Sequence, residues 1–123
     1  GFQHSLQTNS IPDEVRVFRI HGPFLFGSTE KLSVIEDQID NLPKVVMLRL
    51  RNMTAIDATG LHALESLADK LHAAGKHLIL CAPRSQPTRL MERAEFHRHI
   101  GDGNIQPSLA AGIQRARELL DSG

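Results

Sequence analysis

The 123-residue sequence contains a single cysteine, Cys81, and neither tryptophan nor tyrosine. One cysteine excludes an internal disulfide framework and a multi-cysteine zinc site, and it is typical of a reducing compartment. Fourteen Lys and Arg balance fourteen Asp and Glu, so the net charge is zero and the basic field of a nucleic-acid-binding protein is missing. Five Phe offer few rings on which bases could stack. We therefore expect no nucleic-acid partner.

The sequence also lacks an apolar run long enough to span a bilayer and a basic, apolar signal-peptide pattern at its start. Hydrophobic residues make up 41% and charged residues 23%, which suits one soluble globular domain. Residues 1–12 have no clear period and are interpreted as an N-terminal arm or linker. The domain is expected to span residues 13–123.

Patterns for catalysis are missing as well. Neither a phosphate-binding glycine loop nor a G-x-S-x-G elbow occurs in the sequence. His97 and His99 have a spacing that can bind a metal, but too few ligands accompany them, and surface histidines are the better interpretation. Cys81 follows an apolar run, which favours a buried thiol over a nucleophile. We expect no enzymatic activity, no metal and no cofactor.

The spacing of apolar residues alternates between strand-like and helix-like periods, which predicts an α/β domain. In residues 45–51, one face is apolar throughout, whereas the other begins with Val45 and Met47 and ends with Arg49 and Arg51. We therefore expect helices mainly on one face of the sheet, with part of the other face open to water. Strands are predicted at 15–20, 24–26, 45–51, 77–81 and near 105, and helices at 28–42, 58–74, 87–94 and 108–120.

The residues at the start of the second predicted helix carry the most information about function. Asp57 can cap the first turn, and Thr59 lies in that turn with its hydroxyl near the surface. Free N–H groups and the helix dipole make such a position tolerant of anions, and a phosphoryl group on Thr59 would add about 1.5 to 2 negative charges beside Asp57. Asp and Thr are also ordinary first-turn residues, so a purely structural role remains an alternative.

A second candidate is the locally basic segment 84–98. It is interpreted as a docking surface for an acidic partner or for anionic lipid head groups. The alternative is an ordinary solvated helix face with ion pairs between neighbouring turns. The basic residues of this surface are Arg84, Arg89, Arg93 and Arg98.

The run from Ala55 to Leu61, placed after the strand at 45–50, resembles the signature of STAS domains, which sulfate-type anion transporters share with bacterial anti-sigma-factor antagonists. The resemblance implies a STAS fold, an α/β architecture with a mixed sheet of four to five strands and helices mainly on one face. Antagonists carry a phosphorylatable residue just before the motif glycine, which is Thr59 here. The contact loop for partners would comprise Asp57, Ala58, Thr59, Gly60 and Leu61.

Two segments resemble the transporter branch. Residues 20–28, IHGPFLFGS, resemble the I-x-G-P-L-F-F-G segment of SulP permeases, and residues 56–64, IDATGLHAL, resemble their form of the signature. The resemblance implies the C-terminal domain of a bacterial SulP-family anion permease, on the cytoplasmic face of the inner membrane. Such a domain regulates without catalysing. Its expected partners are the transmembrane domain of the same transporter, which provides membrane association, and a sister subunit or a cytosolic regulatory protein.

Two alternatives are kept. The first is a freestanding anti-sigma-factor antagonist that binds its partner only while Thr59 is unphosphorylated. The second, with weaker support, is a nucleotide-binding module that uses the helix start at Thr59 and Gly60 as its anion site.

Overall fold

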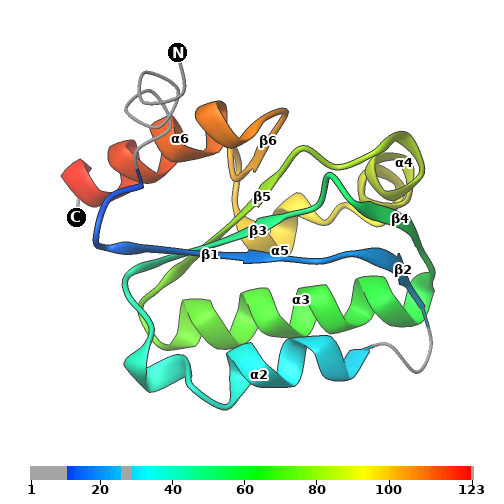
Figure 1. The fold of residues 1–123 in the computed structure, drawn as a ribbon, viewed down its shortest axis with the longest axis horizontal. Helices are drawn as coiled ribbons and strands as arrows, with labels where there is room; N and C mark the ends of the chain where they lie inside the picture. Colours follow the sequence, from blue (N-terminus) through cyan, green and yellow to red (C-terminus); the bar gives the residue numbers. More distant parts are fainter. Residues whose placement is uncertain (1–10, 26–28, 123) are drawn as a thin grey trace.

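The computed structural model describes residues 11–25 and 29–122, and its elements form a layered α/β domain (Figure 1). The four-stranded sheet has the order β1-β3-β5-β6, and β2 and β4 form a separate two-stranded ladder. The predicted α/β fold is confirmed. The strands are β1 (Val15–Arg19), β2 (Gly22–Phe24), β3 (Val45–Arg49), β4 (Met53–Ile56), β5 (His77–Cys81) and β6 (Ile105–Gln106).

Every ladder among the described residues is parallel, so the expectation of a mixed sheet is wrong in this respect. The physical reason is the connections, because helical segments between consecutive strands of the large sheet return the chain to the same end each time. The residues expected to form an N-terminal arm lie outside the described part of the chain, except for its last two.

Helices cover the two faces of the sheet unequally (Figure 1). The larger core lies between the sheet and a layer that includes α2, α3 and α5, and the smaller core lies under α6 alone. This arrangement confirms the expectation that helices pack mainly on one face. The helical segments are η1 (Thr29–Leu32), α2 (Ser33–Glu36), η2 (Ile39–Asn41), α3 (Ala58–Ala73), α4 (Ser85–Arg93), α5 (His97–Ile100) and α6 (Leu109–Ser122).

The single helix predicted for residues 28–42 is broken into η1, α2 and η2. Side chains divert two of the carbonyl groups that would continue it, since Ser33 Oγ donates to the Glu30 carbonyl and Gln38 Nε2 donates to the Val34 carbonyl. Such side-chain bonds compete with the regular helical ladder. The apolar stripe still reaches the core, because Leu32, Ile35 and Leu42 are all buried.

Residues 52–56, which lie between a predicted strand and a predicted helix and were assigned to neither, contain β4. The segment is short and pairs only with β2, so it carries little of the alternation that marks a strand. Of the short strand predicted at 24–26, only Phe24 lies in β2, and residue 26 is outside the described residues. The ladder brings β2 beside the start of α3 (Figure 1).

In the described part of the chain, no helix has both the length and the apolar character needed to cross a membrane.

Candidate functional site at the start of helix α3

Asp57 caps helix α3, as predicted. Its side-chain Oδ1 accepts a hydrogen bond from the Gly60 N–H at 2.8 Å, and its carbonyl accepts one from the Leu61 N–H at 2.9 Å. The backbone of Asp57 is extended, with φ −108° and ψ −178°, which is the usual geometry of an N-cap residue. The carboxylate therefore satisfies one of the free donors of the first turn and complements the helix dipole.

Gly60 sits where the first turn of α3 meets β2. A Cβ atom at this position would overlap the carbonyl oxygen of Phe24 and would approach Phe24 Cδ2 to 2.9 Å. Only glycine allows the helix to come this close to the backbone of a strand. Because Phe24 belongs to the segment 20–28, the two sequence segments that carry the family resemblance are in direct contact.

The five residues of the predicted contact loop differ in what they offer to a partner. Gly60 and Leu61 are buried, Asp57 is half-buried, and Ala58 and Thr59 are exposed. The prediction that Thr59 lies near the surface is confirmed. A contact through this loop would therefore use the side chains of Ala58 and Thr59, with Gly60 and Leu61 serving as the support beneath them.

Thr59 lines a shallow groove of about 300 Å³ that follows α3 on the side of α2. The groove ends at an ion pair in which Lys70 Nζ lies 2.6 Å from Glu36 Oε2. His62 also lines the groove, and its Nδ1 lies 3.5 Å from Glu65 Oε1. Its lining is mixed in charge and suits contact with a protein surface. The groove is lined by Leu32, Glu36, Thr59, His62, Ala63, Ser66 and Lys70.

Gln86, which the sequence did not identify as a site residue, fixes the strand that leads into this loop. Its Oε1 accepts from the Ile56 N–H at 3.0 Å, and its Nε2 donates to the Ile56 carbonyl at 2.9 Å. The side-chain amide thus pairs with both backbone groups of Ile56 as a neighbouring strand would. This contact joins α4 to β4 immediately before Asp57, and no local sequence pattern indicates it.

The structure divides the predicted basic surface. Arg84 precedes α4 and its Nε donates to the Arg51 carbonyl at 2.7 Å, near the ends of the strands. Arg89 and Arg93 are exposed one turn apart on α4. Arg98 lies on α5 and pairs with Glu95 at 3.2 Å. Arg89 and Arg93 are therefore the members that share one helix face.

Cys81 and His99, which the sequence offered as possible reactive groups, both contact other parts of the fold. Cys81 is buried, and burial raises the pKa of its thiol to about 12, which keeps it protonated and unreactive. The interpretation of Cys81 as a core residue is confirmed. His99 Nδ1 lies 3.2 Å from Asp69 Oδ1, and His99 Nε2 lies 3.6 Å from Glu65 Oε2, so this ring joins α5 to α3.

Comparison with known proteins gives a family and a set of similar structures. The STAS domain family model matches residues 7–112. A sulfate transporter family protein from Wolinella succinogenes is 30% identical, with a TM-score of 0.81, and the match covers 90% of this chain and 91% of that one. The comparison with curated proteins finds no match.

Two more distant structures share the fold. The STAS domain of a SulP transporter from Vibrio cholerae is 22% identical, with a TM-score of 0.80, over 99% of this chain and 98% of that one. A protein described as an anti-sigma factor antagonist, from Thermotoga maritima, is 16% identical, with a TM-score of 0.72, over 91% and 92%. Both branches considered from the sequence are therefore represented among the similar structures.

Proposed function

This chain belongs to the STAS domain family, and from that premise we propose that it is the regulatory and interaction domain of a SulP-family sulfate or anion permease. The domain carries out no catalysis. It sits on the cytoplasmic face of the bacterial inner membrane, contacts the transmembrane unit, a sister subunit or a cytosolic regulatory protein, and alters transport when that contact changes.

One observation carries this proposal, namely the 30% identity to a sulfate transporter family protein over nearly the full length of both chains. A local feature adds support. The permease-like segment contributes β2, and the STAS signature contributes Gly60, whose missing side chain makes room for the Phe24 carbonyl of that strand. Both segments that resemble the transporter branch thus form one structural unit at the start of α3.

The contact surface that we propose is the exposed part of this unit. It consists of Ala58, Thr59 and the groove that continues along α3 toward Lys70. The pair Arg89 and Arg93 on α4 is the second surface, suited to an acidic partner by its charge. A protein partner that bridges α2 and α3 would bury the Thr59 hydroxyl, so a charge placed there would oppose binding through desolvation and repulsion.

The gene sequence upstream of residue 1 tests the proposal. We expect it to encode a series of long apolar helices in frame with this domain. A stop codon and an independent start immediately before the domain, with no such helices, would contradict the permease assignment. In the full-length protein, Thr59→Glu should change the transport rate, whereas Thr54→Glu, an exposed position on β4, serves as the matched control.

A second candidate is a freestanding anti-sigma-factor antagonist, and the exposure of Thr59 in the first turn of α3 favours it. In that role a kinase would phosphorylate Thr59, and the modified domain would release its partner. Incubation with a cognate anti-sigma-factor kinase and ATP should then add one phosphate to the wild type and none to Thr59→Val. An unchanged mass for the wild type would remove this candidate.

A further inference from the structure

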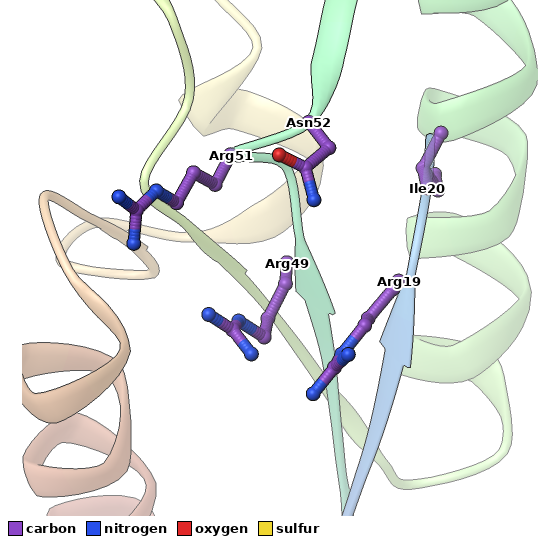
Figure 2. Close-up of a pocket in the computed structure, with 5 residues that line it drawn as sticks. All are labelled: Arg19, Ile20, Arg49, Arg51 and Asn52. Carbon is purple, nitrogen blue, oxygen red and sulfur yellow. The ribbon is translucent and has the colours of Figure 1, made fainter. Parts of the chain in front are cut away.

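Three arginines line one pocket at the carboxyl ends of β1 and β3. Arg19 and Arg49 are register partners on these adjacent strands, so their side chains leave the sheet on the same face. Arg51 and Asn52 lie in the turn after β3, separated from the strand by Leu50. Figure 2 shows the arginine side chains on the side of the strands away from α3, reaching into the same space. The pocket has a volume of about 250 Å³ and is lined by Arg19, Ile20, Arg49, Arg51 and Asn52.

The pocket is open because α6 covers only the apolar part of this face. Gly112 of α6 packs against Cys81, where a Cβ atom would overlap the sulfur atom and would lie 3.4 Å from Met47 Sδ. From there α6 continues over Val15 and Val45 in the smaller core. The arginine end of the face thus lies beyond the residues that α6 buries.

The positive charges in this pocket have no acidic partner in the part of the chain that the structure describes. Among the described residues, no carboxylate lies within 4.0 Å of the guanidinium groups of Arg19, Arg49 or Arg51, and none of the five lining residues is acidic. Arg84 brings a fourth guanidinium to the edge through its bond to the Arg51 carbonyl. By contrast, Arg98 and Arg115 each have a glutamate partner. Like charges concentrated in a concavity produce a local potential that attracts anions.

We propose that this pocket binds a dianionic tetrahedral oxyanion, either sulfate or the phosphate group of a small molecule. Guanidinium groups present paired donors that match the oxygen spacing of such anions, and several groups can bind one anion at once. The Asn52 amide supplies a neutral donor at the same place. The volume lies below the range of about 300 to 1,000 Å³ that is usual for drug-sized ligands, which suits a small anion or a compact ester.

The proposal rests on the pocket alone and does not depend on the role in a permease. It also differs in place from the anion site considered at the start of α3, because the lining residues belong to β1, β3 and the segments that follow these two strands. Loss of the permease assignment would leave it standing, and failure to bind an oxyanion would leave the permease assignment standing.

Isothermal titration of the isolated domain with sodium sulfate and sodium phosphate tests the proposal, with sodium chloride at equal ionic strength as the reference. We expect saturable one-site binding of sulfate or phosphate. Arg49→Gln and Arg19→Gln should each raise the Kd about tenfold or more, because each removes a charged hydrogen bond to the anion. Arg16→Gln is the matched control, since Arg16 is exposed on the opposite face of the same strand, and its Kd should stay within about twofold of wild type.

Two further arms distinguish the source of the oxyanion. Tighter binding of glycerol phosphate than of inorganic phosphate supports a phosphate ester as the ligand, and the reverse order supports the free ion. Co-sedimentation with phosphatidylglycerol vesicles in the absence of any binding of free oxyanions would overturn the proposal in favour of a membrane surface. Equal heats for chloride and sulfate would also overturn it. Circular dichroism checks the fold of each variant, and Arg51→Gln replaces any variant that does not fold.

Discussion

The start of α3 and the arginine pocket lie at the same end of the molecule, where the strands finish, yet they are built in opposite ways. At the start of α3, the Asp57 carboxylate accepts a hydrogen bond from the Gly60 N–H. The packing around Gly60 leaves no room for a Cβ atom. In the pocket, Arg19, Arg49 and Arg51 line one cavity without an acidic partner among the described residues.

This difference separates residues that make the fold from residues that are available to a ligand. The signature residues at the start of α3 can be explained largely by stability, because a cap and a close approach require them. Among the described residues, the guanidinium groups of Arg19, Arg49 and Arg51 form no ion pair, so their concentration in one pocket needs another explanation. Changes at the first region should therefore reduce stability, and changes at the second should leave stability intact while affecting binding.

The largest effect is expected for Gly60→Ala. The added Cβ atom would overlap the Phe24 carbonyl, and neither the helix nor β2 can move away without disturbing the larger core. We expect the free energy of unfolding to fall by about 3 kcal/mol, measured by urea denaturation. Gly75→Ala is the control, since nothing lies within 4 Å of its Cβ position, and its φ of +77° should cost only about 1 kcal/mol. Equal losses for the two variants would contradict the account of close packing.

Gln86→Ala should have the next largest effect. The change leaves the N–H and the carbonyl of Ile56 without their side-chain partner in a part-buried place, for an expected loss of about 2 kcal/mol. Gln114→Ala, an exposed position on α6, should change the stability by less than about 0.5 kcal/mol. A thermal or urea unfolding series compares the two variants. An unchanged stability for Gln86→Ala would show that the hydrogen bonds between Gln86 and Ile56 do not stabilise β4.

Asp57→Ala should lower the free energy of unfolding by about 1 kcal/mol through the loss of the helix cap. Asp57→Asn keeps an oxygen that can accept from the Gly60 N–H, so most of the stability should return. The pair of variants, measured by urea denaturation, separates the hydrogen bond from the charge. A loss for Asn as large as that for Ala would mean that the charge, rather than the cap, provides the stabilisation.

Arg19→Gln should have the smallest effect on stability in chloride buffer, within about 0.5 kcal/mol of wild type, because the side chain is exposed and has no acidic partner among the described residues. The wild type and Arg19→Gln should differ in Tm once sulfate is added. Sulfate should raise the Tm of the wild type above that in chloride at equal ionic strength, by mass action on the folded state, and should raise the Tm of the variant much less. Identical rises in Tm for the two proteins would place any sulfate binding elsewhere.

Much of the fold follows from residue patterns, and the exceptions have physical causes. The alternation in residues 45–51 predicted both the strand and the wet, charged end of one face, which the structure confirms at Arg49. The break of the segment 28–42 escaped prediction because side-chain bonds from Ser33 and Gln38 redirect its backbone. The strand β4 was not predicted because it has four residues and pairs with the short strand β2, so its sequence shows little alternation.

The candidate sites were predictable in part for a similar reason. Asp57 and Thr59 stand in a contiguous motif, so their cap and their exposure could be expected from the sequence. Gln86 contacts a residue thirty positions away, and Arg19 meets Arg49 only through the pairing of two strands. Neither relation leaves a local pattern. Residues brought together by tertiary pairing therefore had to be found in the structure.

One titration tests most directly whether the arginine pocket, and not the start of α3, binds the anion. Sodium sulfate is added to the ¹⁵N-labelled domain at constant ionic strength, and amide chemical shifts are followed by NMR. We expect saturable shifts for the amides of residues 19–20 and 49–52, with the amides of residues 58–61 unmoved. Shifts centred on residues 58–61, with the arginine pocket unmoved, would contradict this expectation and would make the start of α3 the anion site.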